Sequence, residues 1–400
     1  MQGGLCYHAT MKLLFFQIRP TSYESYLYFS EALAAEFQKA GHETVFFNAA
    51  KEPLASMERF RGQHFDAVID FNSVLPKVTT EDGTPFLNTI DAPFFNVILD
   101  HPLYHHNVLK QDLTNYHVLC LDENHCSYLK TCYPHLKSVH LLPMTGSPAL
   151  PGIPFPKKDL PLLFTGSYTS PAEVREAISK IPDFMQEQIS LIIDRMEEDP
   201  ALTIEDTVRE LFPDTIVTEL FPLHMQSFFL ADTYLRASVR DRILRRLVSS
   251  GLPVTLCGNG YKKASFYGEK NAVFLPEVPF PETFPLMARS KITLNILPLF
   301  KNGVHDRVFS AMLNGSAVLT DQSGWLSTHF TPEKHLFFYD SSKEALDTLP
   351  DRVASLLSSE EKLAAVAEAG KKEAFLHHTW EQRFQAFLSV ILSPYGDCAH

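Results

Sequence analysis

The sequence predicts an α/β protein built from two doubly wound parallel sheets that face each other across a cleft. Two observations predict this fold class: short, continuously apolar runs alternate with helical segments in both halves of the chain, and a proline-rich stretch separates the halves. Continuous apolarity indicates strands that are covered on both faces, as in a parallel sheet flanked by helices. Because ligands of such folds bind at the carboxyl ends of the strands, we expect the functional residues there.

The first part of the chain alternates between expected strands and expected helices. Residues Tyr23–Ala40 carry apolar side chains at helical spacing, and Gly41 follows them as a stop signal. Further helical segments are expected at Leu54–Phe60 and Glu123–Cys132. The expected strands are the apolar runs Lys12–Ile18, Thr44–Asn48, Asp66–Phe71, Phe94–Leu99, Val118–Leu121 and Ser138–Leu142.

A proline-rich segment follows these strands. From Pro134 to Pro161, seven of the 28 residues are proline, whereas the 27 prolines among 400 residues predict about two. This density predicts an inter-domain linker. We therefore expect a first domain over residues 1–155 and a second domain that begins at residue 156.

The second part of the chain opens with an inserted helical segment and then returns to strands. The helical segment runs from about Ala172 to Ser250 and is divided by Pro200, Pro213 and Pro222. A helical tail is expected over Asp351–Leu392. The expected strands between them, and the one before them, are Leu162–Thr165, Val254–Cys257, Ala272–Leu275, Ile292–Ile296, Ala317–Thr320 and Leu336–Tyr339.

Composition and charge exclude several classes of protein. Hydrophobic residues make up 45% and charged residues 20% of the chain, which is ordinary for a globular protein and too apolar for a disordered one. The 35 basic and 47 acidic residues give a net charge of −12. General nucleic-acid binding needs a basic face, so we expect no nucleic-acid partner.

Cysteine spacing and hydropathy predict a cytoplasmic protein. The six cysteines show no Cys-x-x-Cys pair and no disulfide framework, so we expect thiols in a reducing compartment. No apolar run reaches the roughly 18 residues of a membrane span, and the first ten residues lack the regions of a signal peptide. The sequence leaves the oligomeric state open.

The segment from Leu294 to Asp321 reads as strand, glycine-containing loop, helix and strand. Gly303 lets the backbone approach a ligand closely, and the helix start beyond it offers free N–H groups. Arg307 is a bidentate phosphate donor, while His305 and Asp306 can hydrogen-bond the hydroxyl groups of a sugar. An alternative stays open, in which Asp306 only caps the helix and Arg307 is solvated.

This segment resembles the donor-binding region of group-1 glycosyltransferases with the GT-B fold, in the bacterial branch related to the spore-maturation protein CgeB. The resemblance covers about Leu162–Tyr339 and extends more loosely to the first domain. It is carried by the order Gly303, His305-Asp306-Arg307, Ala311-Met312, Gly315 and Thr320-Asp321. Supporting matches are Phe164-Thr165-Gly166-Ser167, Val254 with Gly258-Asn259-Gly260-Tyr261, Leu121-Asp122-Glu123-Asn124-His125 and Leu141-Leu142-Pro143.

The resemblance implies two Rossmann-like domains with a cleft between them, and a hexosyl transfer reaction. The second domain, residues 156–375, would bind a nucleotide-diphosphate sugar as donor substrate, and the first would bind a hydroxyl-bearing acceptor. Neither a metal ion nor another cofactor would be required. The final segment, residues 376–400 with Trp380, would cross back to the first domain. A role in making cell-surface glycans follows from the bacterial branch.

Further donor contacts are expected from two glycine turns and one arginine. Gly166 and Ser167 follow one expected strand, and Gly258, Asn259 and Gly260 follow another. These turns either approach the donor or simply reverse the chain, and the resemblance favours donor contacts. A basic helical stretch supplies our best arginine candidate, Arg240, while most of its neighbours are expected to pair with carboxylates; they are Arg236, Arg242, Arg245 and Arg246.

The sequence departs from the group-1 pattern at two positions. Ser310 stands where the group has a helix glutamate, and Asn302 stands where it has another glutamate eight residues earlier. In the group these glutamates contact ribose and donor sugar. Two alternatives therefore stay open beside the transferase: an epimerase or hydrolase acting on a nucleotide sugar, and a non-catalytic homologue that binds a sugar or a partner.

Asp100 and His101 are the candidate catalytic residues of the first domain. They follow an expected strand, where a carboxylate or an imidazole could deprotonate an acceptor hydroxyl. The alternative is that Asp100 caps the next helix. His101 and His105 have a spacing that metal sites use, but Pro102 argues against a helix through them and no His-Glu-x-x-His pattern occurs. We therefore expect no metal site.

Overall fold

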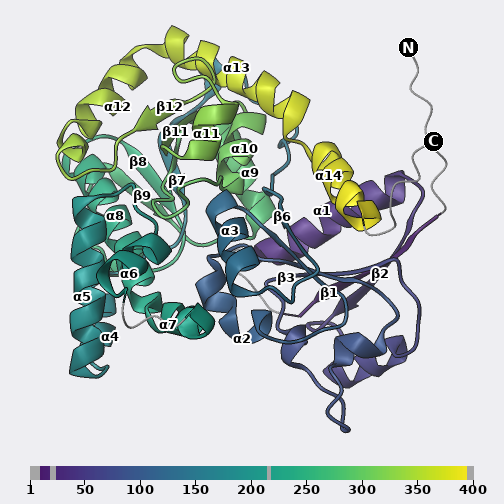
Figure 1. Ribbon diagram of the computed structural model, residues 1–400. Coiled ribbons are helices and arrows are strands. Elements are labelled where there is room, and N and C mark those ends of the chain that lie inside the picture. Colours follow the sequence, from purple (N-terminus) through teal and green to yellow (C-terminus); the bar gives the residue numbers. More distant parts are fainter. Residues whose placement is uncertain (1–9, 19–23, 214–217, 394–400) are drawn as a thin grey trace. The chain divides into compact units, whose positions relative to one another are not determined.

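The computed structural model describes residues 10–18, 24–213 and 218–393 (Figure 1). Among these residues the chain divides into two compact units. The first unit comprises the chain up to Cys120, then Cys126–Leu142, and the chain from Trp380 onwards. The second unit comprises Leu121–His125 and Pro143–Thr379, so its long segment begins inside the proline-rich stretch.

The first unit is organised around a six-stranded sheet in which all pairings are parallel, in the order β2-β1-β3-β4-β5-β6. The direction of winding changes between β1 and β3, which are neighbours in the sheet. Ligands of doubly wound sheets bind outside the carboxyl ends of the strands at such a point. The strands are β1 (Lys12–Gln17), β2 (Glu43–Asn48), β3 (Ala67–Phe71), β4 (Phe94–Val97), β5 (Tyr116–Cys120) and β6 (Ser138–Leu141).

Aromatic side chains fill the core of the first unit. Phe15, Phe71 and Phe95 come from three strands and are fully buried, as continuous apolarity requires for strands covered on both faces. The last helix, α14, lies beside the first helix, α1 (Figure 1). Phe37 of α1 packs edge-on against Phe384 of α14, with the ring centroids 4.9 Å apart. The α-helices of this unit are α1 (Ser25–Lys39), α2 (His106–Leu109), α3 (Glu123–Cys132), whose first residues fall in the second unit, and α14 (Trp380–Leu392).

The second unit contains the other six-stranded sheet, also with parallel pairings, in the order β12-β11-β10-β7-β8-β9. Counted from β7, this is the 3-2-1-4-5-6 order of the Rossmann fold, with the change of winding between β7 and β10. The strands are β7 (Leu160–Thr165), β8 (Val254–Cys257), β9 (Ala272–Leu275), β10 (Ser290–Asn295), β11 (Ala317–Asp321) and β12 (Phe337–Tyr339).

The helices of the second unit include an insertion between β7 and β8. Pro171 and Pro222 lie in the first turns of two of these helices, where proline costs no hydrogen bond. The inserted helices are α4 (Pro171–Ile178), α5 (Asp183–Glu198), α6 (Ile204–Leu211), α7 (Phe221–Ser227) and α8 (Phe229–Ser249). The later ones are α9 (Thr283–Arg289), α10 (Asp306–Leu313), α11 (Gly324–His329), α12 (Leu349–Ser358) and α13 (Glu360–His377).

Most elements expected from the sequence are confirmed, with small corrections. All twelve expected strands occur among the described residues, with ends shifted by one to a few positions. The expected helical segment Leu54–Phe60 is a 3₁₀ helix, and Pro222 lies in the first turn of a helix, at one of the divisions of the inserted segment. Tyr23, the expected start of the first helix, lies outside the described residues. No helix among the described residues is long and apolar enough to cross a membrane.

Candidate functional site

Arg307 lies at the carboxyl ends of β7 and β10, where the winding of the second sheet changes. It is the second residue of α10, and only 7% of it is exposed. Its Nη1 donates to Asn295 Oδ1 at 2.7 Å, and its Nε donates to Thr165 Oγ1 at 3.3 Å. Both acceptors are neutral oxygens at strand ends, so these bonds orient the guanidinium while leaving its positive charge in place.

Arg240 of α8 joins Arg307 around the ring of Phe164. The guanidinium carbons lie 5.5 Å and 5.1 Å, respectively, from the ring centroid, within the range of cation–π contact. Arg240 Nη1 also donates to Ser167 O at 2.6 Å. The structure thus brings the basic helix, the first glycine turn and the start of α10 to one point of the sheet edge.

The other four arginines of α8 pair with carboxylates, as the sequence indicates. These carboxylates balance their positive charge without a ligand. The pairs are Arg236 with Asp232 (2.8 Å), Arg242 with Glu197 (3.0 Å), Arg245 with Asp241 (3.4 Å) and Arg246 with Asp347.

The two predicted glycine turns contact each other. Tyr168 N donates to Asn259 O at 2.8 Å, and Tyr261 OH donates to Gly166 O at 2.7 Å. Gly260 has φ = 89°, and a Cβ there would lie 2.0 Å from Tyr168 O. A side chain at this position would therefore be strained and would separate the turns. Gly258 N donates to Leu275 O, which ties the second turn to the end of β9.

His305 caps α10, and Asp306 begins it. His305 Nδ1 accepts the N–H of Arg307 at 3.1 Å, so a neutral ring carries its proton on Nε2. Burial, and then the nearby Arg307 and Arg240, hold the pKa of His305 well below its ordinary value. Burial raises the pKa of Asp306 to about 7, although Arg307 opposes this rise. The site therefore presents a neutral imidazole N–H and a carboxyl group that exchanges its proton near neutral pH.

Asn302 and Gly303 are held by the segment Leu121–His125. Asn302 N donates to Asp122 Oδ2 at 2.9 Å, and Glu123 N donates to Asn302 O at 3.0 Å. Gly303 forms an antiparallel bridge with Asp122, and a Cβ on it would lie 2.5 Å from Leu121 O. A glycine is therefore needed at this position, because the backbone of Leu121 and the side chain of Asp122 leave no room for a Cβ. Burial raises the pKa of Asp122 to about 6.

Ser310 is fully buried at the position where the resembling group has a glutamate. Its Oγ donates to Asp306 O at 2.8 Å, one turn earlier. A Cβ on Gly146 would lie 2.2 Å from this Oγ, so the backbone of residue 146 presses directly against the serine. This close packing opposes a longer side chain at the position.

Asp100 and His101 lie in the first unit, after β4. Asp100 Oδ2 accepts a hydrogen bond from Asn72 Nδ2 at 3.2 Å, and Asn72 Oδ1 accepts the N–H of Leu99 at 2.8 Å. Asn72 has φ = 47°, a conformation that asparagine tolerates better than most residues. His101 is buried, and its Nδ1 accepts the N–H of Leu103 at 3.0 Å, which caps the following 3₁₀ turn.

The same edge of the first sheet contains a buried carboxyl group that sequence reasoning did not single out. Asp70 of β3 is 1% exposed, and burial raises its pKa to about 8. Its Oδ1 accepts the N–H of Phe71, while no hydrogen-bond partner of Oδ2 occurs among the described residues. In the sequence, the only indication of such a role is that Asp70 lies near the carboxyl end of an expected strand.

Tyr339 and Asn295 lie at the carboxyl edge of the second sheet, and the sequence did not single them out as site residues. Tyr339 OH donates to Asn295 O at 2.9 Å, which links the ends of β12 and β10. Asn295 uses its side chain to orient Arg307, as described above. Both are polar residues at the carboxyl ends of apolar runs, which is a signal that the sequence carries but that does not reveal the partner.

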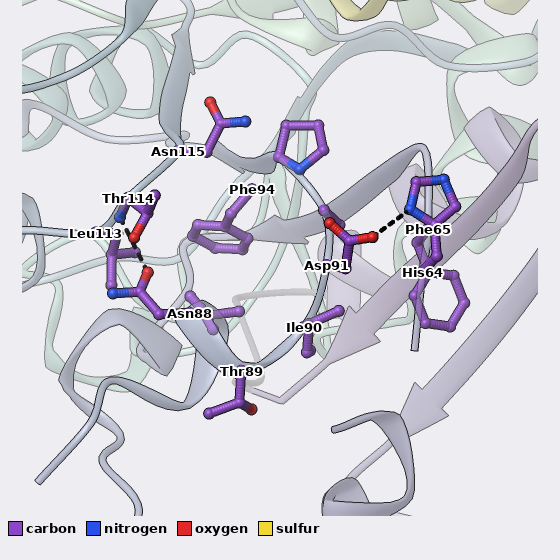
Figure 2. A pocket seen from close by; sticks show the side chains of 13 residues that line it. His64, Phe65, Asn88, Thr89, Ile90, Asp91, Phe94, Leu113, Thr114 and Asn115 are labelled. Carbon is purple, nitrogen blue, oxygen red and sulfur yellow. Dashed lines mark hydrogen bonds and ion pairs between the residues drawn. The ribbon is translucent and has the colours of Figure 1, made fainter. Parts of the chain in front are cut away.

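A pocket of about 410 Å³ in the first unit lies away from these residues (Figure 2). It is lined by segments that precede β3, β4 and β5, so it opens at the amino ends of the strands. His64 Nδ1 and Asp91 Oδ2 lie 2.8 Å apart at its rim, and Asn88 Oδ1 accepts the N–H of Thr114. Strand direction therefore separates this pocket from the edge that carries Asp70 and Asp100. Within the described parts of the chain, no three His, Cys, Asp or Glu residues are grouped so that they could hold a metal ion.

The comparisons with known proteins agree with this fold. Residues 236–389 match the model of a family described as glycosyl transferase-like. Sucrose-phosphate synthase from Thermosynechococcus elongatus is 9% identical, with a TM-score of 0.56 over 96% of this chain and 99% of that chain. An alpha-glucosyltransferase in complex with UDP is 10% identical, with a TM-score of 0.56 over 96% of this chain and 100% of that chain.

Another structure of an alpha-glucosyltransferase, with UDP and a 13-mer DNA, is 11% identical, with a TM-score of 0.54 over 96% of this chain and 100% of that chain. The comparison with curated proteins gives no match. The solved structures therefore show the fold of GT-B glycosyltransferases, and the family match is confined to residues 236–389.

Proposed function

We propose that this protein transfers a sugar from a nucleotide-diphosphate sugar to a hydroxyl-bearing acceptor. The observation that carries the proposal is the pair of arginines, Arg240 and Arg307, around Phe164 at the point where the second sheet changes its winding. A diphosphate needs concentrated positive charge, and this is the position where doubly wound sheets bind their ligands. The match of residues 236–389 to a glycosyl transferase-like family supports the same assignment.

The donor would be bound by groups that the sequence had singled out. Arg307 and the N–H groups at the start of α10 would contact the diphosphate, and Arg240 would stabilise the departing nucleoside diphosphate. The Nε2 proton of His305 and the carboxyl group of Asp306 would hydrogen-bond sugar hydroxyls. The turns with Gly166, Ser167, Gly258, Asn259 and Gly260 would border the nucleoside.

Positive charge from the protein supports transfer without a metal ion. Metal ions in sugar transfer neutralise the diphosphate, and here two arginines and a helix N-terminus supply charge of the same sign. We therefore propose that the reaction needs no cofactor beyond the donor substrate. An activity assay in the presence of EDTA tests this point, since loss of activity with the chelator would contradict it.

Asp100 would act as the base toward the acceptor. His101 Nδ1 already accepts a backbone N–H, so a neutral His101 ring holds its proton on Nε2 and is better placed to orient its own turn. The side chain of Asp100 accepts a hydrogen bond from Asn72 Nδ2 at the sheet edge of the first unit. A carboxylate can remove the proton of a hydroxyl as the new glycosidic bond forms.

The finer assignments are proposals that rest on the sequence. The order of Gly303, His305, Asp306, Arg307 and Gly315 supports the bacterial branch related to CgeB, and with it a hexosyl donor and a cell-surface glycan. The cysteine pattern supports a cytoplasmic location. The net charge of −12 argues against a nucleic-acid acceptor, although an alpha-glucosyltransferase of similar fold has been solved with DNA.

The test is a thermal-shift and calorimetric panel of nucleoside diphosphates and their sugars, followed by product analysis. We expect one nucleoside diphosphate to raise the melting temperature, because a ligand that binds the native state stabilises it. With a matching donor and a set of glycan, protein and small-molecule acceptors, we expect nucleotide release only when an acceptor is present. Binding of no nucleotide at all would overturn the proposal, and release without an acceptor would indicate a hydrolase or epimerase.

One observation favours a second candidate, a non-catalytic protein that binds a nucleotide sugar. The two positions where the group carries glutamate are occupied by Asn302, whose side chain donates to Glu123, and by Ser310, which is fully packed. Such a protein would bind the donor and release no nucleotide with any acceptor. The product analysis above separates the two candidates.

A further inference from the structure

Two cysteine thiols lie together where β5 ends and α3 begins. Cys120 Sγ and Cys126 Sγ are 3.2 Å apart, and both side chains are buried. A disulfide needs the sulfurs at about 2.05 Å, so a shift of roughly one ångström would bring them to bonding distance. The sequence indicated thiols without a disulfide framework, and their proximity could not be read from the spacing alone.

The two thiols flank the segment Leu121–His125, which forms hydrogen bonds with Asn302 and contacts Gly303. Leu121–His125, the residues between the cysteines, belong to the second unit, whereas Cys120 and Cys126 belong to the first. The segment makes backbone and side-chain hydrogen bonds with residues 302–304. In two of them, Asn302 N donates to Asp122 Oδ2 at 2.9 Å and Val304 N donates to Leu121 O at 3.3 Å.

We propose that Cys120 and Cys126 are a redox-active dithiol that hydrogen peroxide converts into an intramolecular disulfide. The Cys126 thiolate attacks one peroxide oxygen, the O–O bond breaks, and Cys126 becomes a sulfenic acid as the other oxygen leaves as hydroxide, which a proton converts to water. Cys120 then attacks the Cys126 sulfur, the S–S bond forms, and the S–O bond breaks to release a second water. The dithiol loses two electrons and two protons, and the peroxide is reduced to two waters.

Cys126 is the cysteine that reacts first. It is 8% exposed, whereas Cys120 is fully buried. Cys126 also lies in the first turn of α3, where the helix dipole stabilises a thiolate. Cys120 acts as the resolving thiol because its sulfur already lies next to that of Cys126.

The disulfide restrains the segment that contacts the donor loop. A covalent ring from Cys120 to Cys126 restricts the backbone conformations of Leu121–His125, so the conformation that pairs with residues 302–304 should gain population. The effect on Asn302 and Gly303 follows from contacts within the second unit. Only an effect on donor binding rests on the proposed function.

The test treats the full-length reduced chain with hydrogen peroxide and blocks the remaining thiols by alkylation. We expect a mass loss of about 2 Da, a Cys120–Cys126 cross-linked peptide and full reversal by dithiothreitol. Hydrogen exchange of the Asn302 and Val304 amides should slow by about threefold or more. Alkylation of both cysteines after oxidation, a cross-link elsewhere, a gain of about 32 Da on Cys126, or unchanged exchange at residues 302–304 would overturn the proposal.

Variants test whether the cross-link and the change in hydrogen exchange depend on these two cysteines. Cys126→Ser and Cys126→Ala should each lose the cross-link and the exchange difference, and their melting curves show whether they fold. Cys132→Ser is the matched control on the same helix and should retain both. Cys257, whose Sγ donates to Pro276 O and whose thiol pKa burial raises to about 11, should stay unoxidised. A chain that forms the disulfide but binds no UDP in either redox state supports the dithiol and contradicts the proposed donor site.

Discussion

The carboxyl edge of the first sheet carries amides and carboxyl groups, whereas that of the second sheet carries two arginines against an aromatic ring. In the first unit, Asn72 supports Asp100 and a buried Asp70 lies at the end of β3. In the second unit, Arg240 and Arg307 meet around Phe164. Both sheets are parallel and doubly wound. The chemical difference between the two edges therefore comes from the side chains at the strand ends and not from the fold.

Under the proposed function, this difference predicts a division of tasks between the two edges. A cationic edge suits the diphosphate of a nucleotide sugar, and an edge of amides and carboxyl groups suits hydroxyl groups, which accept and donate hydrogen bonds. A change at one edge should therefore affect binding of the donor, and a change at the other should affect transfer to the acceptor.

The largest expected effect is on transfer, from the first edge. Asp100→Asn removes the proposed base and should lower the transfer rate by about 10²- to 10⁴-fold, while the Kd for UDP stays within about twofold. Kinetics with saturating donor and calorimetry with UDP measure the two quantities. A parallel loss of UDP affinity would break the comparison, because the first edge would then serve the donor as well.

The next effect is on nucleotide affinity, from the second edge. Arg307→Ala removes a buried, charge-assisted contact and should weaken UDP binding by about 100-fold, and Arg307→Lys should recover only part of it. Arg245→Ala is the matched control, because the exposed side chain of Arg245 pairs with Asp241 on the same helix. If both alanine variants bind UDP equally in calorimetry, the second edge is not the donor site.

A smaller effect is expected on the loop that precedes Arg307. Gly303→Ala places a Cβ against Leu121 O and Asp122, so the loop or the segment must move, at a cost of about 1–3 kcal/mol in the free energy of unfolding. Gly152→Ala is the control, since a Cβ at Gly152 would meet no atom within 4 Å. Urea denaturation measures both variants, and equal stability would contradict the close approach.

The smallest effect concerns the buried carboxyl group of the first edge. Burial raises the pKa of Asp70 to about 8, so the folded chain keeps a proton that the unfolded chain, with a pKa of 3.8, releases. Stability from this group is complete below pH 4 and falls as the pH rises toward 8. Between pH 6.5 and 8 the loss should be about 1–2 kcal/mol in the wild type.

Asp70→Asn should remove that loss while keeping the shape of the side chain. Urea denaturation at pH 6.5 and pH 8 gives the difference, with Asp91→Asn, an exposed carboxylate, as the control. The other buried carboxyl groups titrate in all three proteins and cancel in the comparison. A wild-type curve and an Asp70→Asn curve with the same pH dependence would show that Asp70 does not hold its proton.

The sequence contained the elements and many of the candidate residues. Continuous apolar runs predicted all twelve strands, because a strand buried on both faces must be apolar at every position. The sequence also singled out Arg240 and Arg307, which lie far apart along the second half of the chain, and the structure brings both guanidinium groups to the ring of Phe164. Periodicity and turn chemistry are local properties, so one chain suffices to reveal them.

Only the tertiary structure decided which residues meet. The order of the strands placed Thr165 beside Asn295 and so gave Arg307 its acceptors. The approach of Leu121 to Gly303 and the contact of Cys120 with Cys126 depend on how the chain returns to itself. Asp70 ends an apolar run like any strand-end polar residue, and only its complete burial gives it a raised pKa. Pairing, close approach and desolvation arise from packing between separate elements of the fold, which local sequence patterns do not encode.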